Sequence, residues 1–328
     1  MLIFSITTTT KIASVSLHDG RKMLGEIRIE VAKTHSVGIL DQIDRLLEWT
    51  GKKLENIDTV LVSIGPGSFT GVRIAISVVK GLFYGKNINI CEVNELDALA
   101  YQAYYTIWNV CGYNNIRYSI DNETESFNII NSDMRNIRRN IKIYSMIDSG
   151  KEKIYYSVYE LVYKGKNLDS SQLYNINGTE DYINGTEDYK ADKSDNLEKI
   201  KDYKVDKLDN IIDDIIENTV KDRFSNEDWN NEIQGRGEKI VYFVGDGAFN
   251  YKDKIIQKLE NIEKENFGIE NFKDIKIRFL EDRNMKINSL TFVEMFLNGK
   301  LKNTDIFSLK PDYLEKSQAE RDKKERGK

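Results

Sequence analysis

The sequence contains few of the residues that usually mark a secreted or metal-dependent protein. Among its 328 residues are only 2 cysteines and 2 histidines. Cys91 and Cys111 are too few for a disulfide framework, which favours a reducing, cytoplasmic compartment. His18 and His35 lie 17 positions apart, so HExxH and other two-histidine metal motifs are excluded.

Long apolar runs and an excess of basic charge are also missing. No uninterrupted apolar run approaches the roughly 20 residues that a membrane-spanning helix needs. The start, MLIFSITTTT, lacks the charged n-region and the longer apolar stretch of a signal peptide. With 48 basic and 53 acidic residues the net charge is −5, which provides no overall attraction for a nucleic-acid backbone. Any contact with nucleic acid must therefore be local or come from a partner.

The apolar residues that are present, 40% of the chain, follow the patterns of an α/β protein. Short β-rich runs alternate with segments whose apolar residues recur every three or four positions, which predicts strands and amphipathic helices. Asp19-Gly20, after the second run, is a tight hairpin signal. In the first hundred residues we expect strands at 2–6, 12–17, 23–31, 59–64 and 88–93, and helices at about 35–49, at 69–84 and from 95.

Changes in composition divide the chain into two unequal α/β domains with insertions. The tandem copy INGTEDYINGTEDY at 176–189 belongs to a polar stretch that cannot bury enough apolar area to fold. Further strands are expected at 141–148, 153–163, 239–244 and 275–280, and helices at 208–220, to about 265 after the GDGA turn, and at 287–298. We assign residues 1–105 to a first domain, 106–140 to an insertion, 141–310 to a reduced second domain with a flexible insertion at 164–204, and 311–328 to a charged tail.

The most informative segment is GPGSFTGVR at 65–73, between a buried strand and a helix. Its Pro66 is one of only 2 prolines, where average usage predicts roughly 16. Flanked by Gly65 and Gly67, it fixes a sharp turn that lets neighbouring backbone approach closely. Such a turn can cradle an anion with its N–H groups, although neither a P-loop nor a GxGxxG pattern is present. A packing turn without a ligand is the alternative.

Small residues are spaced four apart along the helix that follows. The pairs are Gly71 with Ala75 and Ser77 with Gly81, and such spacing leaves a shallow groove for another helix. The helix at 35–49 carries an apolar stripe wider than one buried face requires. Packing against the chain's own sheet explains either feature alone. Together they predict a helical docking surface for a partner.

These segments resemble a known protein family. SITTTTKIASVSL, THSVGILDQIDRLL, SIGPGSFTGVRIAISVVKGL and VNELDALA are similar to the N-terminal domain of TsaB, the bacterial tRNA threonylcarbamoyladenosine biosynthesis protein also called YeaZ. The resemblance resumes at MIDSGKEKIYYSVYE, VGDGA and LKPDYLEKSQAE, and covers most of the chain except about 106–140 and 164–204. GPGSFTGVR within its strand and helix is the specific motif, and the others occur in the family's order.

The resemblance implies an actin, sugar-kinase and heat-shock-ATPase-like fold with two domains of shared topology. It also implies a non-catalytic scaffold subunit that pairs, through the two helices above, with TsaD, which transfers threonylcarbamoyl to N6 of adenosine 37 in tRNA. In that family a small ATPase, TsaE, joins the assembly. We expect tRNA contact only through the complex, a homodimer in the absence of TsaD, and no cofactor of its own, with any nucleotide at the partner interface. The candidate docking residues are His35, Ile39, Ile43, Leu46, Ser68, Phe69, Gly71, Arg73, Ala75, Ser77 and Gly81, beside the glycine loop Gly65, Pro66 and Gly67.

Departures from related chains argue against independent catalysis. The catalytic relative carries a metal-binding HxxxH pair, and the aligned positions here are Glu95 and Leu99; leucine cannot ligate a metal. The superfamily's nucleotide-orienting Asp at the end of the first strand is replaced by Thr7. The family's Asp-Ala-Arg segment reads Asp-Ser-Gly at 148–150. We therefore assign no catalytic residue and no metal site.

Two enzymatic alternatives stay open. A stand-alone ATP-binding enzyme would hydrolyse nucleotide as the purified chain. A glycoprotease-like hydrolase could use Ser68, His35 and Asp41, although GxSxG is absent and nothing in the sequence aligns the three. The basic residues that could touch tRNA in the assembled complex, or form only a solvated stretch, are Arg135, Arg138, Arg139 and Lys142.

Overall fold

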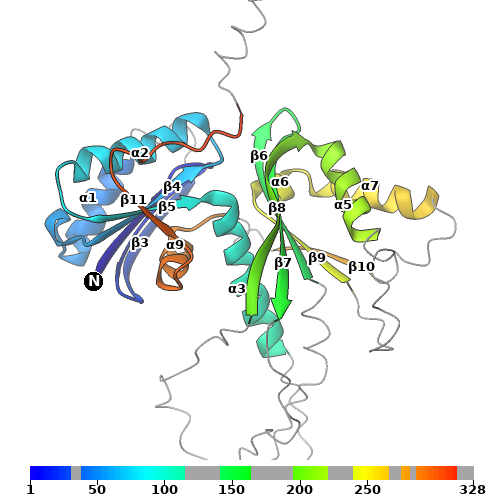
Figure 1. Ribbon diagram of the computed structural model, residues 1–328, viewed down its shortest axis with the longest axis horizontal. Helices are drawn as coiled ribbons and strands as arrows, with labels where there is room; N and C mark the ends of the chain where they lie inside the picture. Colours follow the sequence, from blue (N-terminus) through cyan, green and yellow to red (C-terminus); the bar gives the residue numbers. More distant parts are fainter. Residues whose placement is uncertain are drawn as a thin grey trace, which may run out of the picture.

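Two lobes, each built around one mixed sheet, lie side by side (Figure 1). The computed structural model describes residues 1–30, 38–114, 141–163, 195–220, 239–265, 275–280 and 286–315. Within these ranges, no helix combines the length and the apolar character needed to cross a bilayer.

The first sheet has the strand order β11-β5-β4-β1-β2-β3. β1 pairs antiparallel with β2 and parallel with β4, and β4 pairs parallel with β5. The hairpin predicted at Asp19-Gly20 joins β2 to β3, and Gly20 adopts a φ of 55° there. The strands are β1 (Leu2–Thr7), β2 (Ile12–Asp19), β3 (Lys22–Glu30), β4 (Thr59–Gly65), β5 (Asn89–Asn94) and β11 (Lys302–Thr304).

The second sheet, β10-β9-β6-β7-β8, repeats the plan of the first. β6, β7 and β8 form an antiparallel meander, and β9 and β10 extend the sheet in parallel from β6. The two central strand orders are therefore equivalent, which confirms the predicted pair of domains with one shared topology. The strands are β6 (Ile141–Gly150), β7 (Lys153–Tyr163), β8 (Asp195–Lys207), β9 (Lys239–Val244) and β10 (Ile275–Phe279).

Helices cover both faces of the first sheet. α1 (Ile39–Thr50) and α2 (Phe69–Phe83) share a core with one face, and α3 (Glu95–Asn114) and α9 (Ser289–Leu297) lie on the other. In the second lobe α5 (Leu208–Val220) and α7 (Lys252–Glu265) pack together over the outer face. The two short helical segments are the 3₁₀ turn η2 (Leu54–Asn56) and α6 (Asp246–Asn250).

Alternation along β1 explains this two-sided burial. Leu2, Phe4 and Ile6 join the core beneath α1 and α2, whereas Ser5 faces α9, where its hydroxyl lies 2.6 Å from that of Ser16 and donates to the Ser289 carbonyl at 2.8 Å. Hydroxyls at these buried positions are thus satisfied by each other and by α9.

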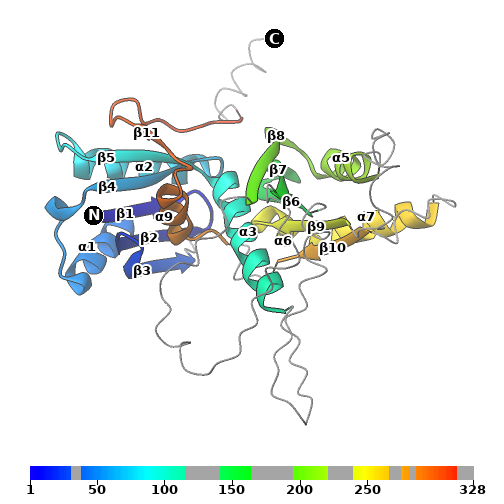
Figure 2. The ribbon, with the colours of Figure 1, turned by 60° about the horizontal axis from the view of Figure 1, so that its bottom comes forward.

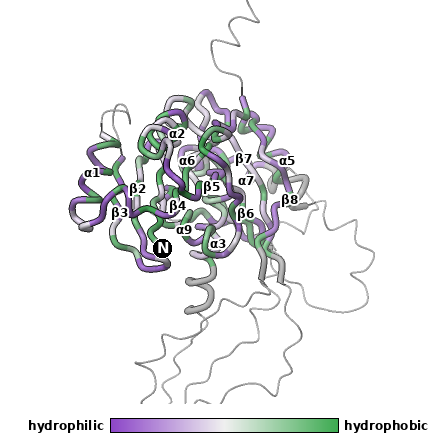
Figure 3. The backbone as a smooth tube through the Cα atoms, turned by 60° about the vertical axis from the view of Figure 1, so that its left-hand side comes forward, coloured by the Kyte–Doolittle hydropathy of each residue, from purple (hydrophilic) through white to green (hydrophobic). Residues whose placement is uncertain are grey.

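The helix α1 has one side in contact with the sheet and one side exposed to solvent. Figure 3 shows hydrophilic and hydrophobic residues alternating along it, as expected for such a helix.

α3 connects the lobes and lies between their sheets (Figure 2). Its Leu96 and Ala100 belong to one apolar cluster together with Leu61 of the first lobe and Ile143 of the second. The lobes therefore share a core rather than each closing its own.

Two predicted domain boundaries are wrong. Residues 289–304, assigned to the second domain, return to the first sheet as α9 and β11, because β11 pairs with the edge of β5 and α9 buries Phe292 and Val293 over β1. Residues 310–315, expected to begin a charged tail in solvent, pack on the first lobe through Asp312 and Tyr313, and Glu315 pairs with Lys153 of the second lobe.

The predicted insertions are shorter than expected where they can be compared. Residues 106–114 form the last turns of α3, and residues 195–204 belong to β8, paired with β7 along its length. The remainder of both insertions, including Arg135, Arg138 and Arg139, lies outside the described residues, while Lys142 lies on β6.

Candidate functional site

The glycine loop joins β4 to α2 and is closed on the chain's own backbone. The Ser68 N–H donates to the Thr9 carbonyl at 2.6 Å, and the Thr8 hydroxyl donates to the Gly71 carbonyl at 2.6 Å. A Cβ at Gly67 would lie 2.4 Å from the Thr9 carbonyl oxygen, and one at Gly71 would lie 1.9 Å from that of Thr8. Only glycine therefore permits this contact.

The close backbone contact is what a packing turn requires. The Ser68 N–H, which would face a bound anion at the start of α2, already has a partner. The Ser68 hydroxyl caps the helix by accepting from the Gly71 N–H at 3.2 Å. The Gly65–Pro66 peptide bond is cis, and both residues are buried.

The small residues of α2 divide between its two sides. Gly71 and Ala75 are buried against the chain's own fold, whereas Ser77 and Gly81 are exposed. The predicted groove is thus corrected: the first pair allows close packing of α2 on β1 and the Thr8–Thr9 turn, and only the second pair is accessible to a partner.

The wide apolar stripe of α1 divides in the same way. Ile39, Ile43 and Leu46 are buried beneath the helix, so these three candidates contact the chain's own sheet and are corrected. The apolar stripe of α1 is nevertheless wider than its buried face, because Leu40 is 50% exposed and Trp49 is 73% exposed on the outer side. His35 lies outside the described residues.

The segment at 305–315 runs along the outer side of α2, as the red trace in Figure 1 shows. Near the end of α2, Phe307 packs edge-on against Tyr84 at 6.0 Å between ring centroids. Near the start of α2, the Tyr313 ring stacks on Phe69 at 4.5 Å. The Asp312 N–H donates to the Ile64 carbonyl at 2.8 Å, which ties the segment to the strand before the glycine loop. Phe69 is therefore partly covered.

Three positions that were predicted to differ from related chains, Thr7, Glu95 and Leu99, are all buried in the interior. Thr7 Oγ1 donates to both carboxylate oxygens of Glu95, at 3.1 and 3.2 Å, and the Ser63 hydroxyl donates to the same group. Burial raises the pKa of Glu95 to about 7, and the surrounding hydroxyls offset only part of that shift. Leu99 is buried and apolar. Among the residues described, no three His, Cys, Asp or Glu side chains are grouped to hold a metal ion.

A small cleft between the lobes has Lys11, Leu99, Asp246 and Phe249 in its lining. Its volume is about 100 Å³, well below the roughly 300–1,000 Å³ of pockets that enclose ligands. Asp246 accepts from the Asp148 N–H at 2.9 Å, and burial raises the pKa of Asp246 to about 6. The Asp-Ser-Gly segment at 148–150 thus lies at the β6–β7 turn, beside this cleft.

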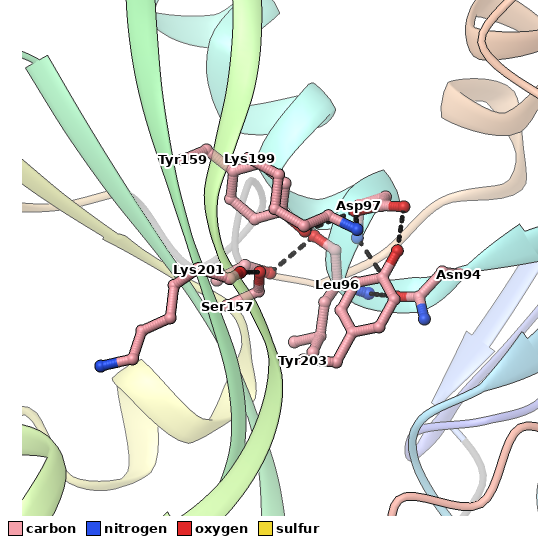
Figure 4. Close-up of polar contacts among 9 residues, drawn as sticks. Asn94, Leu96, Asp97, Ser157, Tyr159, Lys199, Lys201 and Tyr203 are labelled. Carbon is pink, nitrogen blue, oxygen red and sulfur yellow. Dashed lines mark hydrogen bonds and ion pairs between the residues drawn. The ribbon is translucent and has the colours of Figure 1, made fainter.

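One polar cluster was not anticipated from the sequence (Figure 4). Asp97 at the start of α3 accepts from Tyr159 of β7 at 2.6 Å and from Tyr203 of β8, and Lys199 pairs with it at 3.1 Å. The Lys199 ammonium also lies 3.5 Å from the centroid of the Tyr203 ring. These contacts attach the outer strands of the second sheet to the connecting helix. Because β8 falls in a segment assigned to an insertion, sequence patterns alone gave no reason to join these residues.

The proposed hydrolase residues have other roles where they are described. Ser68 caps α2, and Asp41 lies on α1 with its carboxylate 3.9 Å from the Arg45 side chain. His35 lies outside the described residues, so the trio as a whole is not tested.

Comparison with known proteins supports the resemblance to TsaB. The family model for TsaD, tRNA N6-adenosine threonylcarbamoyltransferase, matches residues 24–112. The tRNA threonylcarbamoyladenosine biosynthesis protein TsaB of Haemophilus influenzae is 32% identical over 105 residues, 32% of this chain and 44% of that protein. TsaB of Escherichia coli is 31% identical over 121 residues, 37% of this chain and 50% of that protein. The match thus spans at most half the length of these relatives.

A solved structure extends the comparison of the fold to nearly the whole chain. YeaZ from Pseudomonas aeruginosa aligns over 95% of this chain and 99% of its own, with a TM-score of 0.51 and 15% sequence identity. At that identity the alignment establishes the fold. The predicted resemblance to TsaB and YeaZ and the predicted fold class are thereby confirmed.

Proposed function

We propose that this chain is the non-catalytic scaffold subunit of a tRNA threonylcarbamoyladenosine synthesis complex, in which it pairs with a TsaD-type catalytic subunit. Its relatives are named as tRNA threonylcarbamoyladenosine biosynthesis proteins, which supports a role for this chain in that pathway. The match of a TsaD model to residues 24–112 supports a domain shared with the partner, and related domains commonly associate through equivalent surfaces.

The observation that carries this proposal is the outer side of α1 and α2. Ser77 in the middle of α2 and Gly81 in its last turn are exposed, and small side chains there let a partner helix approach closely. Leu40 and Trp49 add exposed apolar surface on α1, which a partner would remove from water. The closed glycine loop fixes the start of α2 and so holds this surface rigid.

The interior supports a role without chemistry of its own. Glu95 is enclosed by hydroxyls, Leu99 is apolar, and the glycine loop is occupied by backbone. We therefore propose that the chain needs no cofactor, that a nucleotide, if the complex holds one, binds with the partner, and that TsaE and tRNA join through the assembled complex. Without TsaD, the same surface would pair two copies of this chain.

The experiment mixes the purified chain with the TsaD of the same organism and measures co-elution, binding affinity and threonylcarbamoyl transfer to tRNA. The decisive variant is Gly81→Phe, because a Cβ at Gly81 meets no atom within 4 Å and the new ring projects into solvent. We expect binding at least about tenfold weaker, or roughly 1.4 kcal/mol. Gln257→Phe, at an exposed position of α7 in the other lobe, is the matched control and should bind as the wild type does.

Two results would contradict the proposal. One is failure of the wild-type chain to bind TsaD. The other is nucleotide hydrolysis by the chain alone, at a rate that TsaD does not alter. That result would favour the alternative of a stand-alone ATP-binding enzyme.

A further inference from the structure

Arg73 lies on the exposed side of α2 and, within the part of the chain that the structure describes, forms no ion pair. Arg28 and Arg278 share this lack of a carboxylate partner, whereas Arg21 and Arg45 each have one. The exposure of Arg73 alone would mean little, since isolated surface charges are ordinary.

The guanidinium of Arg73 is nevertheless held in one place. Its central carbon lies 3.9 Å from the centroid of the Phe69 ring, one turn earlier on α2. Its Nε donates to the Tyr313 hydroxyl at 2.6 Å, and the Tyr313 ring stacks on Phe69. One ring from the same helix and one from a segment 240 residues after Arg73 therefore fix the plane of one exposed cation.

This arrangement uses Nε and leaves the two terminal nitrogens of Arg73 without a described partner. A planar pair of N–H donors matches the two oxygens of a carboxylate, and an ordered guanidinium loses less side-chain freedom on binding than a mobile one. We propose that Arg73 is the charged anchor of the docking surface and receives an Asp or Glu carboxylate of the partner subunit. This inference rests on the proposed function and adds the chemistry of the partner's contact.

The surroundings favour a protein carboxylate over a tRNA phosphate. The rings beside Arg73 are those of Phe69 and Tyr313, and at the other end of α2 the neutral rings of Tyr84 and Phe307 are 71% and 75% exposed; aromatic surface of this kind suits a protein interface. The Lys80 ammonium is directed to the Phe307 carbonyl at 3.4 Å. A nucleic-acid surface needs several cations along a backbone, and this face presents one fixed guanidinium.

The test compares affinities for TsaD of the wild type and of Arg73→Glu, Arg73→Lys and Tyr313→Phe. Arg73→Glu should weaken binding roughly 100-fold, and Arg73→Lys roughly tenfold, because lysine keeps the charge but not the paired donors. Tyr313→Phe keeps the stacked ring and removes only the Nε acceptor, so its loss should be smaller, roughly threefold. Circular dichroism verifies that each variant is folded.

The matched control is Arg278→Glu, which makes the same charge reversal at an exposed position on β10 and should leave affinity within about twofold. If the wild type binds and Arg73→Glu behaves like this control, the anchor is wrong and the scaffold function stands. If the wild type does not bind TsaD, both are overturned. If Arg73→Glu spares TsaD binding and weakens tRNA binding by the complex, a phosphate replaces the carboxylate and the proposal fails.

Discussion

At the scale of single residues, His18 shows how burial changes chemistry without creating a site. Its side chain is fully buried on β2, on the side of the sheet that α9 covers, and neither ring nitrogen has a hydrogen-bond partner among the described residues. Burial favours the neutral ring and lowers the pKa of His18 from 6.5 to about 4. The sequence pattern could not show that His18 is enclosed.

His18 should make the fold acid-sensitive. The unfolded chain takes up a proton on this ring below pH 6.5 and the folded chain only near pH 4, so stability is lost as pH falls between these values. The shift corresponds to about 3 kcal/mol. His18→Leu should remove this part of the pH dependence, measured as the free energy of urea unfolding at several values from pH 7.5 to 4.5. An equal acid loss in both proteins would show that other groups account for it.

At the scale of elements, sequence patterns predicted nearly every helix and strand but not which side of each faced inward. A small residue suits a tight internal contact as well as an external groove, so Gly71 and Ser77 look alike in the sequence. What distinguishes them is the Thr8–Thr9 turn, some sixty positions earlier, which contacts Gly71, whereas Ser77 is exposed. The role of Arg73 was equally hidden, because Tyr313 comes from a segment expected to lie in solvent.

The two glycines of α2 should respond oppositely to the same substitution. Gly71→Ala would place a Cβ 1.9 Å from the Thr8 carbonyl oxygen, so backbone must move, and we expect a loss of roughly 3 kcal/mol. Gly81→Ala meets nothing within 4 Å and should gain about 0.5–1 kcal/mol from helix propensity. Urea unfolding of both variants measures the difference. Similar effects at the two positions would contradict the assignment of inner and outer sides.

At the scale of the whole molecule, the sequence indicated two domains, and the structure shows how closely they are joined. Composition marks the insertions because polar repeats stand out, but it carries no signal for a late strand that returns to an early sheet. β11 has three residues and pairs with β5, more than 200 positions earlier. Pairing over such a separation leaves no local periodicity to detect.

The shared core should make the lobes unfold together. α3 places Leu96 and Ala100 in one cluster with residues of both sheets, so neither lobe can lose its structure without exposing the other's apolar surface. Differential scanning calorimetry should show a single transition whose calorimetric and van't Hoff enthalpies agree. Two separated transitions would mean that the lobes are energetically independent.

The late return of α9 and β11 also constrains the order in which the protein can be made. As the chain leaves the ribosome, β1–β5 and α3 emerge first, yet the part of their sheet that α9 covers stays exposed and the edge of β5 stays unpaired until residues 289–304 have been synthesised. Through translation of the whole second lobe, the first is a nascent sheet with one uncovered area and one open edge, available to chaperones or to misassociation. The lobe that comes first in the sequence is therefore the last to be finished.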